Sequence, residues 1–145
     1  MNVLFLSSWY PTEKNPNFGV FVKEHARSIK QAGNQIVVIA LVLRKDKKIF
    51  HLKKTDFRDE NGVRTITLEI ESIFKNCFYY LTSFQYIFIK RATKQLIKSG
   101  FRPELIHSNV VFSAGIMGSQ LADQYHLPHV ITEHWSRIDG ILKKP

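Results

Sequence analysis

Residues 2–11 read NVLFLSSWYP, and this stretch decides the fold class. A continuous apolar run from Val3 to Leu6 is followed at once by polar and turn-forming residues. Short uninterrupted apolar runs are typical of strands that are buried on both faces of a parallel sheet. The stretch therefore predicts a buried first strand that brings Ser7 and Ser8 to the carboxyl edge of the sheet.

The residues after this loop predict a complete β-α-β unit. From Phe18 to Ile29 apolar residues recur at helical spacing with charged residues between them, and Gly33 ends the pattern. Residues 35–43, QIVVIALVL, are rich in β-branched side chains and uninterrupted, as expected of a second buried strand.

The rest of the chain continues this alternation. We expect residues 44–61 to form an exposed connection, with a short extra strand at 49–52, because they are rich in charge and lack a sustained apolar period. Further strands are predicted at 63–70, 105–107 and 127–132, and helices at 78–98 and 112–125. The alternation predicts an α/β, Rossmann-like, doubly wound parallel sheet with strand order 3-2-1-4-5.

Composition limits the classes of partner and compartment. The 145 residues suffice for one core, and the formal net charge of +9 favours anionic partners. No nucleic-acid-binding motif is present, so we expect no nucleic acid partner. The single cysteine, Cys77, excludes an intramolecular disulfide and suits a reducing cytoplasm; we expect it to be buried as a small apolar side chain. The N-terminus does not resemble a secretion signal.

Polar residues follow three of the predicted strands. Ser7 and Ser8 follow the first strand, His107 ends the fourth, and Glu133–His134 follow the fifth. In a doubly wound sheet ligands bind beyond the carboxyl ends of the strands, where the winding direction reverses. We therefore expect the loops at 7–19 and 107–113 to face each other across a crevice.

The remaining histidines, His25, His51, His126 and His129, share no convergent position and no metal-ligand spacing. We therefore treat them as surface or packing residues and expect no metal site.

Both ends of the chain carry segments that belong together in a known family. At the N-terminus these are VLFLSSWYP at 3–11, NP at 15–16, FGVFV at 18–22 and Glu24. Near the C-terminus they are PELIH at 103–107, AG at 114–115 and PHVITEHWS at 128–136. Together they resemble the N-terminal domain of the retaining family 4 glycosyltransferases, which have the GT-B fold. Residues 44–99 lie outside the resemblance.

The resemblance implies transfer of a sugar from a nucleotide-sugar donor to an acceptor, in a cleft between two Rossmann-like domains. Residues 1–145 would be the single acceptor-side domain, a truncated part of a hexosyltransferase, and inactive alone. The C-terminal donor-binding domain would be its partner, and a glycan or lipid-linked molecule its acceptor. The nucleotide sugar would be a co-substrate of the full-length enzyme, and no cofactor or metal is expected here. The alternative is a stand-alone flavodoxin-like module that binds a phosphorylated ligand without catalysis.

The resemblance also assigns roles to residues at the crevice. His134 stands at the position of the active-site histidine and would contact the transferred sugar, whereas the structural alternative is a histidine that caps a strand end. Gly19 would let backbone amides approach a phosphate or an acceptor hydroxyl, or would simply start the helix. Phe18 would line the acceptor cleft, or would pack against the helix start as a hydrophobic staple.

Three further residues are candidate substrate contacts. His107 ends a strand beside the switch point, where a polar ligand contact is expected. Asn109 stands where many relatives carry a second histidine. Glu133 would bind a sugar hydroxyl, or would serve as the partner of His134.

The predicted helix at 78–98 combines aromatic and basic side chains. Such a helix suits the headgroup region of an anionic membrane, with Tyr86, Lys90, Arg91 and Lys94 as membrane-facing candidates. The alternative is a core helix with a solvated basic face. The first interpretation predicts a cytoplasmic protein that is peripheral at the inner face of the membrane.

Overall fold

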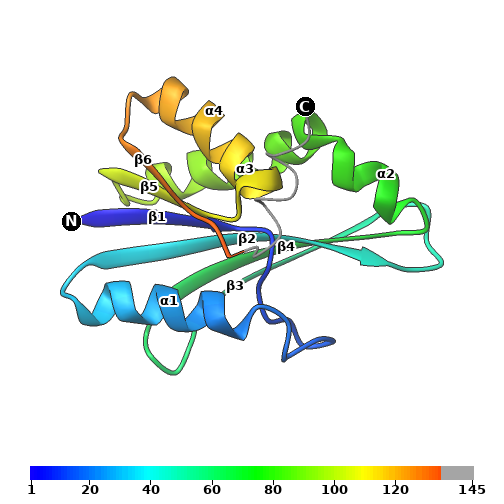
Figure 1. The fold of residues 1–145 in the computed structure, drawn as a ribbon, viewed down its shortest axis with the longest axis horizontal. Helices are drawn as coiled ribbons and strands as arrows, with labels where there is room; N and C mark the ends of the chain where they lie inside the picture. The colour runs from blue at the N-terminus through cyan, green and yellow to red at the C-terminus, as the bar shows by residue number, and fades with distance from the viewer. Residues whose placement is uncertain (135–145) are drawn as a thin grey trace, which may run out of the picture.

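The computed structural model describes residues 1–134, which contain one six-stranded sheet of order β3-β4-β2-β1-β5-β6 (Figure 1). The strands are β1 Asn2–Ser7, β2 Gln35–Lys45, β3 His51–Arg58, β4 Arg64–Ser72, β5 Leu105–Asn109 and β6 His129–Thr132. All neighbouring strands are parallel except β3, which pairs antiparallel with β4. The predicted order of the five parallel strands is confirmed.

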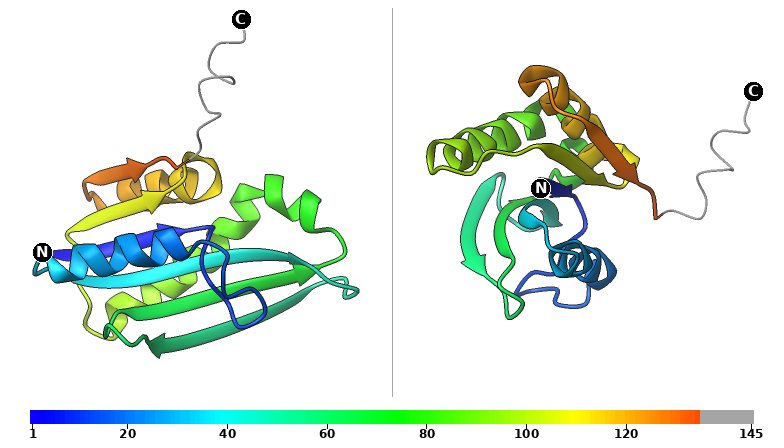
Figure 2. Two further views of the ribbon diagram at one scale, coloured as in Figure 1. Left: turned by 60° about the horizontal axis from the view of Figure 1, so that its bottom comes forward. Right: turned by 90° about the vertical axis from the view of Figure 1, so that its left-hand side faces the viewer.

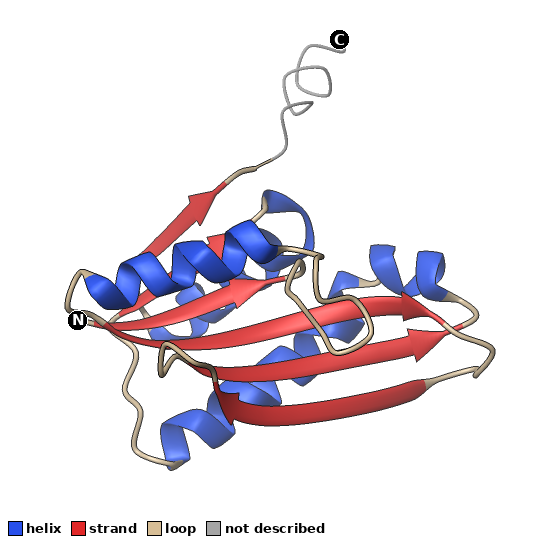
Figure 3. Cartoon of the chain, turned by 90° about the horizontal axis from the view of Figure 1, so that it is seen from below, coloured by secondary structure: helices blue, strands red, loops and turns tan. Residues whose placement is uncertain are grey.

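Helices cover both faces of the sheet (Figures 2 and 3). Helix α1, Val20–Gln31, packs on one face, where Val22 and Ala26 are fully buried against apolar side chains of β1 and β2. Helices α3, Thr82–Lys98, and α4, Ile116–Tyr125, cover the opposite face. This division explains the uninterrupted apolar runs of β1 and β2, because both faces of each strand are buried.

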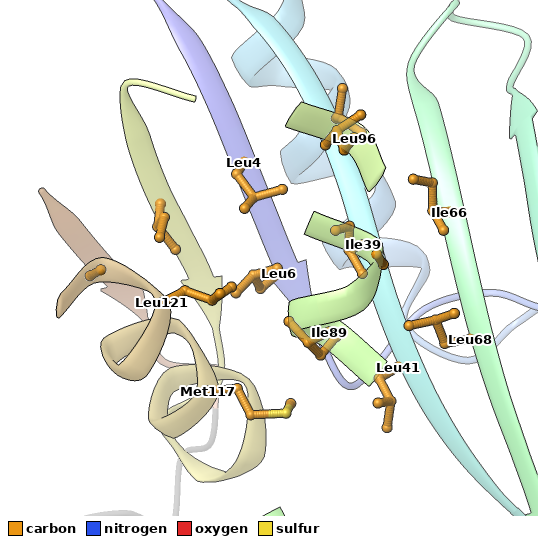
Figure 4. Close-up of a cluster of buried hydrophobic side chains, with 14 of the residues drawn as sticks. Leu4, Leu6, Ile39, Leu41, Ile66, Leu68, Ile89, Leu96, Met117 and Leu121 are labelled. Carbon is orange, nitrogen blue, oxygen red and sulfur yellow. The ribbon is translucent and has the colours of Figure 1, made fainter. Parts of the chain in front are cut away.

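The larger of the two cores lies beneath α3 and α4 (Figure 4). Leu4, Leu6 and Ile39 from the central strands are at most 1% exposed there, as are Ile89 and Leu121 from the helices. Burial of one such side chain contributes about 1.5–3 kcal/mol relative to full exposure. The central strands therefore form a rigid support for the loops at their carboxyl ends.

Strand β3 corrects the expectation of an exposed connection at 44–61 with a short strand at 49–52. It has eight residues and pairs with β4 from His51↔Glu71 to Arg58↔Arg64. Its charged residues made the strand hard to recognise in the sequence. An edge strand with one solvated face carries charges where a central strand carries apolar residues. Arg64 also donates two hydrogen bonds to the Asp56 carboxylate, at 3.0 and 2.9 Å, and so ties the two strands together.

The predicted helix at 78–98 is divided at Leu81. Helix α2, Lys75–Tyr80, precedes the break and α3 follows it. The side-chain amide of buried Gln85 donates to the carbonyls of Phe78 and Tyr79, at 2.6 and 3.1 Å, and so satisfies the end of α2. The short helix also leaves Cys77 exposed, whereas the sequence analysis expected it to be buried.

Candidate functional site

The carboxyl ends of β1, β5 and β6 meet at one edge of the sheet. Ser7 pairs in register with Asn109, and Asn109 pairs in turn with Thr132. Beyond this edge the hydroxyl of Ser8 lies 2.9 Å from that of Ser113, which itself donates to Oε1 of Gln85 at 2.8 Å. The loops that follow β1 and β5 therefore face each other, as expected at the switch point.

Histidine rings from α1, β5 and the end of β6 converge around Asn109. The buried Oδ1 of Asn109 lies 2.9 Å from Nε2 of His134 and 3.2 Å from Nδ1 of His25. The ring centroid of His25 is 4.9 Å from that of His107 and 6.1 Å from that of His134. We call His25, His107, Asn109 and His134 the histidine cluster.

His25 is the member of the histidine cluster that the sequence analysis missed. It was treated as a surface or packing residue, but it contacts residues that follow it by more than eighty positions. Its signal was its place on the helix, because it shares the core-facing stripe of Val22 and Ile29. A polar residue on an apolar stripe needs a buried partner, and Asn109 supplies it.

Two members of the histidine cluster, His107 and His134, have lowered pKa values and are therefore neutral at neutral pH. Burial, together with the neighbouring His25, His129 and His134, lowers the pKa of His107 to about 4. Burial also lowers the pKa of His134, with a further contribution from His25, while the Glu133 carboxylate acts in the opposite direction. A neutral imidazole both donates and accepts hydrogen bonds, so the cluster is suited to hydroxyl groups. Nε2 of His107 already has such a partner, the Thr132 hydroxyl at 2.8 Å.

Aromatic side chains border the cluster on its exposed side. The Phe21 ring contacts His134 with a centroid separation of 4.9 Å, and Trp9 lies 6.2 Å from Phe21. Phe18 lies on the other side of Trp9, at a ring-centroid separation of 6.3 Å, so that Phe18, Trp9 and Phe21 form a strip of aromatic rings. Phe18 and Phe21 are 39% and 48% exposed, so the strip is accessible to a ligand.

Gly19 begins α1 directly beside this strip. Its backbone is left-handed, with φ of +74°, and an added Cβ would lie 2.6 Å from the carbonyl carbon of Trp9 and 2.7 Å from the nitrogen of Tyr10. The Gly19 carbonyl accepts hydrogen bonds from the N–H groups of Val22 and Lys23. The packing of the loop thus accounts for a glycine at this position without a ligand.

Glu133 supports the loop that follows β5. Its Oε2 accepts a hydrogen bond from the N–H of Val111 at 2.8 Å, and its Oε1 accepts one from the N–H of His134 at 2.8 Å. The adjacent Val110 and Ser113 have φ of +73° and +71°, conformations that are strained for residues other than glycine. Glu133 therefore contributes to holding a strained turn and His134 at the same edge.

The membrane-facing candidates occupy two environments. Tyr86 is half-buried on the larger core, and its hydroxyl donates to Oε1 of Gln124 at 3.0 Å. Lys90, Arg91 and Lys94 are exposed. The exposed large apolar side chains between positions 73 and 87, which we together call the apolar patch, are Ile73, Phe74, Tyr80, Leu81 and Ile87.

Residues 1–134 contain no group of three or more histidine, cysteine, aspartate or glutamate side chains that could hold a metal ion. In the same range no helix is long and apolar enough to cross a membrane. Trp135 and Ser136, which contribute to the family resemblance, lie outside the described residues.

Comparison with known proteins supports the fold. The chain is similar in structure to a sucrose-phosphate synthase from Thermosynechococcus elongatus, with a TM-score of 0.61 and 16% sequence identity. The similarity covers 100% of this chain and 36% of that protein, so the chain spans about a third of its length. At this identity the likeness establishes the fold, a Rossmann-like half of the GT-B type. No protein-family model and no curated protein sequence matches the chain.

Proposed function

We propose that this chain is the acceptor-side domain of a retaining glycosyltransferase, which moves a sugar from a nucleotide-sugar donor to a glycan or lipid-linked acceptor. The observation that carries the proposal is the hydrogen-bonded arrangement of His25, Asn109 and His134 at the switch point. The GT-B type of fold gives the second line of support.

The chemistry of the site suits a carbohydrate. A sugar presents hydroxyl groups at its edges and C–H groups on its faces, so it needs hydrogen-bonding groups beside aromatic rings. Neutral His134 supplies the former, and the exposed rings of Phe18 and Phe21 supply the latter. In this role His134 contacts the transferred sugar, and Asn109 fixes the orientation of its ring.

The proposal requires a second domain. The family resemblance assigns the nucleotide-sugar contacts to a C-terminal donor-binding domain, which would close over the histidine cluster. In this account the present domain binds the acceptor, needs no metal or other cofactor of its own, and is inactive alone.

The experiment that tests the proposal uses the product of the complete coding sequence. Nucleoside diphosphate release is measured with a panel of nucleotide sugars and a glycan and lipid extract as the acceptor source. The substitution His134→Ala should lower the rate at least about 100-fold. His126→Asn is the matched control, because His126 is exposed and asparagine tolerates its left-handed backbone. Equal activity of the wild type and His134→Ala would contradict the role of His134.

The runner-up function is a stand-alone module that binds a phosphorylated ligand in the crevice without catalysis. A saturable nucleotide affinity of this chain, with no transfer by the complete gene product, would favour it.

A peripheral position at the cytoplasmic face of the membrane is a further part of the proposal. The apolar patch supports it, because five large apolar side chains are each at least 44% exposed there. Exposed apolar groups of this size mark interaction surfaces. The exposed cations of α3 would add an attraction to anionic headgroups.

A further inference from the structure

A second hollow lies between the β1–α1 loop, the carboxyl end of β2 and the start of α2. Its volume is about 280 Å³. Figure 1 shows α2 beside the carboxyl ends of β2 and β4, at the edge that also carries the candidate site. Phe18 lines this hollow, and Trp9 connects it through ring contacts to Phe21 and His134.

The side chains around the hollow make it strongly cationic. Lys14, Arg44, Lys45 and Lys75 line it, and no carboxylate within residues 1–134 does. Among the described residues neither Lys45 nor Lys75 takes part in an ion pair. Two positive charges therefore face the hollow without a counter-charge, which favours an anionic occupant.

The other two cations, Lys14 and Arg44, each lie beside a buried glutamate. Nζ of Lys14 lies 2.6 Å from Oε1 of Glu71, which is 3% exposed, and this hydrogen bond holds the pKa of Glu71 below its usual range. Nη1 of Arg44 lies 3.8 Å from Oε2 of Glu69, too far for a hydrogen bond. Glu71 thus positions Lys14 at the rim of the hollow, and Glu69 lies beside Arg44.

Unpartnered polar atoms provide an independent sign of a ligand. Thr12 is only 9% exposed, and its Oγ1 has no hydrogen-bond partner in the part of the chain that the structure describes. Nη1 of Arg44 is also buried without one. Backbone hydrogen bonds of 3.2 and 3.0 Å between Thr12 and Asn15 hold the backbone of this turn in place. Because buried polar atoms are normally hydrogen-bonded, these two donors indicate a missing acceptor.

We propose that this hollow binds the phosphate group of a phosphorylated acceptor. A phosphate monoester is a compact dianion with several acceptor oxygens, which matches a hydroxyl, a guanidinium and several ammonium donors. The inference rests on the proposed function, since it names the class of acceptor that would lie along Phe18 toward His134. The phosphate could belong to a soluble sugar phosphate or to a lipid headgroup.

The test is isothermal titration of this protein at low salt with glucose 6-phosphate, glucose and inorganic phosphate. We expect saturable binding of glucose 6-phosphate, competition by inorganic phosphate and no binding of glucose. Lys75→Gln and Thr12→Val should each weaken the binding about tenfold, because each removes a hydrogen bond to a charged group. Arg102→Gln is the matched control, since Arg102 is exposed just before β5, at the opposite edge of the sheet, and the substitution should leave the affinity unchanged. Thermal melting curves verify that each variant is folded.

A further titration with dihexanoyl phosphatidic acid distinguishes the two sources of phosphate. Binding of this lipid without binding of glucose 6-phosphate assigns the hollow to a lipid headgroup, and the reverse assigns it to a soluble sugar phosphate. Failure of all the phosphate probes to bind overturns the proposal, as does binding that neither Lys75→Gln nor Thr12→Val weakens. These readouts are independent of sugar transfer, so the hollow and the proposed function can fail separately.

Discussion

Nε2 of His134 lies 2.9 Å from Oδ1 of Asn109, although Asn109 ends β5 and His134 follows β6. An amide oxygen can only accept a hydrogen bond, so the imidazole nitrogen that faces it must carry the hydrogen. The same oxygen lies 3.2 Å from Nδ1 of His25. Asn109 thus selects a tautomer for each ring.

The first prediction concerns these tautomers. We expect the Nε2–H form for His134 and the Nδ1–H form for His25, as measured by nitrogen-15 NMR of the ring nitrogens at pH 7.5. The substitution Asn109→Asp places a carboxylate beside His134 and should raise its pKa by about one unit or more. Asn76→Asp, at an exposed position in α2, should leave that pKa unchanged. The opposite tautomer at either ring would mean that the amide nitrogen of Asn109, not its oxygen, faces the histidines.

The second prediction concerns the pH dependence of stability. The pKa of His107 is about 4 in the folded protein, whereas an unfolded histidine titrates near 6.5. Between these values the unfolded state binds the extra proton, so the free energy of unfolding falls as the pH falls. Between pH 7 and pH 5 His107 alone should account for a loss of about 2 kcal/mol.

Urea denaturation at the two pH values measures this loss. His107→Gln removes the titrating group while keeping a partner for Thr132, so its stability should fall by about 2 kcal/mol less than that of the wild type over the same range. Equal pH dependence of the two proteins would show that His107 is not held neutral by the fold.

The third prediction concerns Gly19. In Gly19→Ala the new methyl group would meet the backbone of Trp9 and Tyr10 at a left-handed position, so we expect a destabilisation of about 3 kcal/mol. Gly33→Ala is the matched control, because Gly33 is also left-handed but has nothing within 4 Å of the added Cβ. That control should lose only about 1 kcal/mol. Chemical denaturation measures the free energy of unfolding of both variants. If both lose a similar amount, the loop at Trp9 can shift at little cost to accommodate the methyl group.

The fourth prediction concerns the apolar patch. The double variant Phe74→Asn, Leu81→Asn should bind phosphatidylserine vesicles at least tenfold more weakly than the wild type at low salt, because it removes two exposed apolar side chains. Phe57→Asn, on edge strand β3, removes a similarly exposed ring elsewhere and should bind normally. Co-sedimentation measures both, and a wild-type protein that does not bind would refute membrane docking.

The sequence predicted the parts of the fold whose causes are local. The runs at 2–6 and 35–43 are continuous because both strand faces are buried, and that burial is visible in the sequence itself. The length of strand β3 was underestimated. Its residues alone do not indicate a strand, and it forms one because it pairs at the edge of the sheet. The break at Leu81 depends on hydrogen bonds from Gln85, which no helical period reveals.

In the candidate site, too, the features with local causes were predicted and those that depend on packing between distant segments were not. The positions of His107 and His134 followed from strand ends and topology, whereas Asn109 was singled out by the family resemblance. His25 was missed because its partner, Asn109, lies across the sheet on another strand, and only the packing of α1 brings them together. The cationic hollow was missed as well, since Lys14, Arg44 and Lys75 come from a loop, a strand and a helix that lie far apart in the sequence.

The central claim is that this chain is the acceptor-side half of a glycosyltransferase, and sequencing the gene beyond the codon for Pro145 tests it most directly. We predict an in-frame second α/β domain that carries two glutamates spaced for a donor site. A stop codon at that point would contradict the claim and would leave a binding module built on this half of the fold.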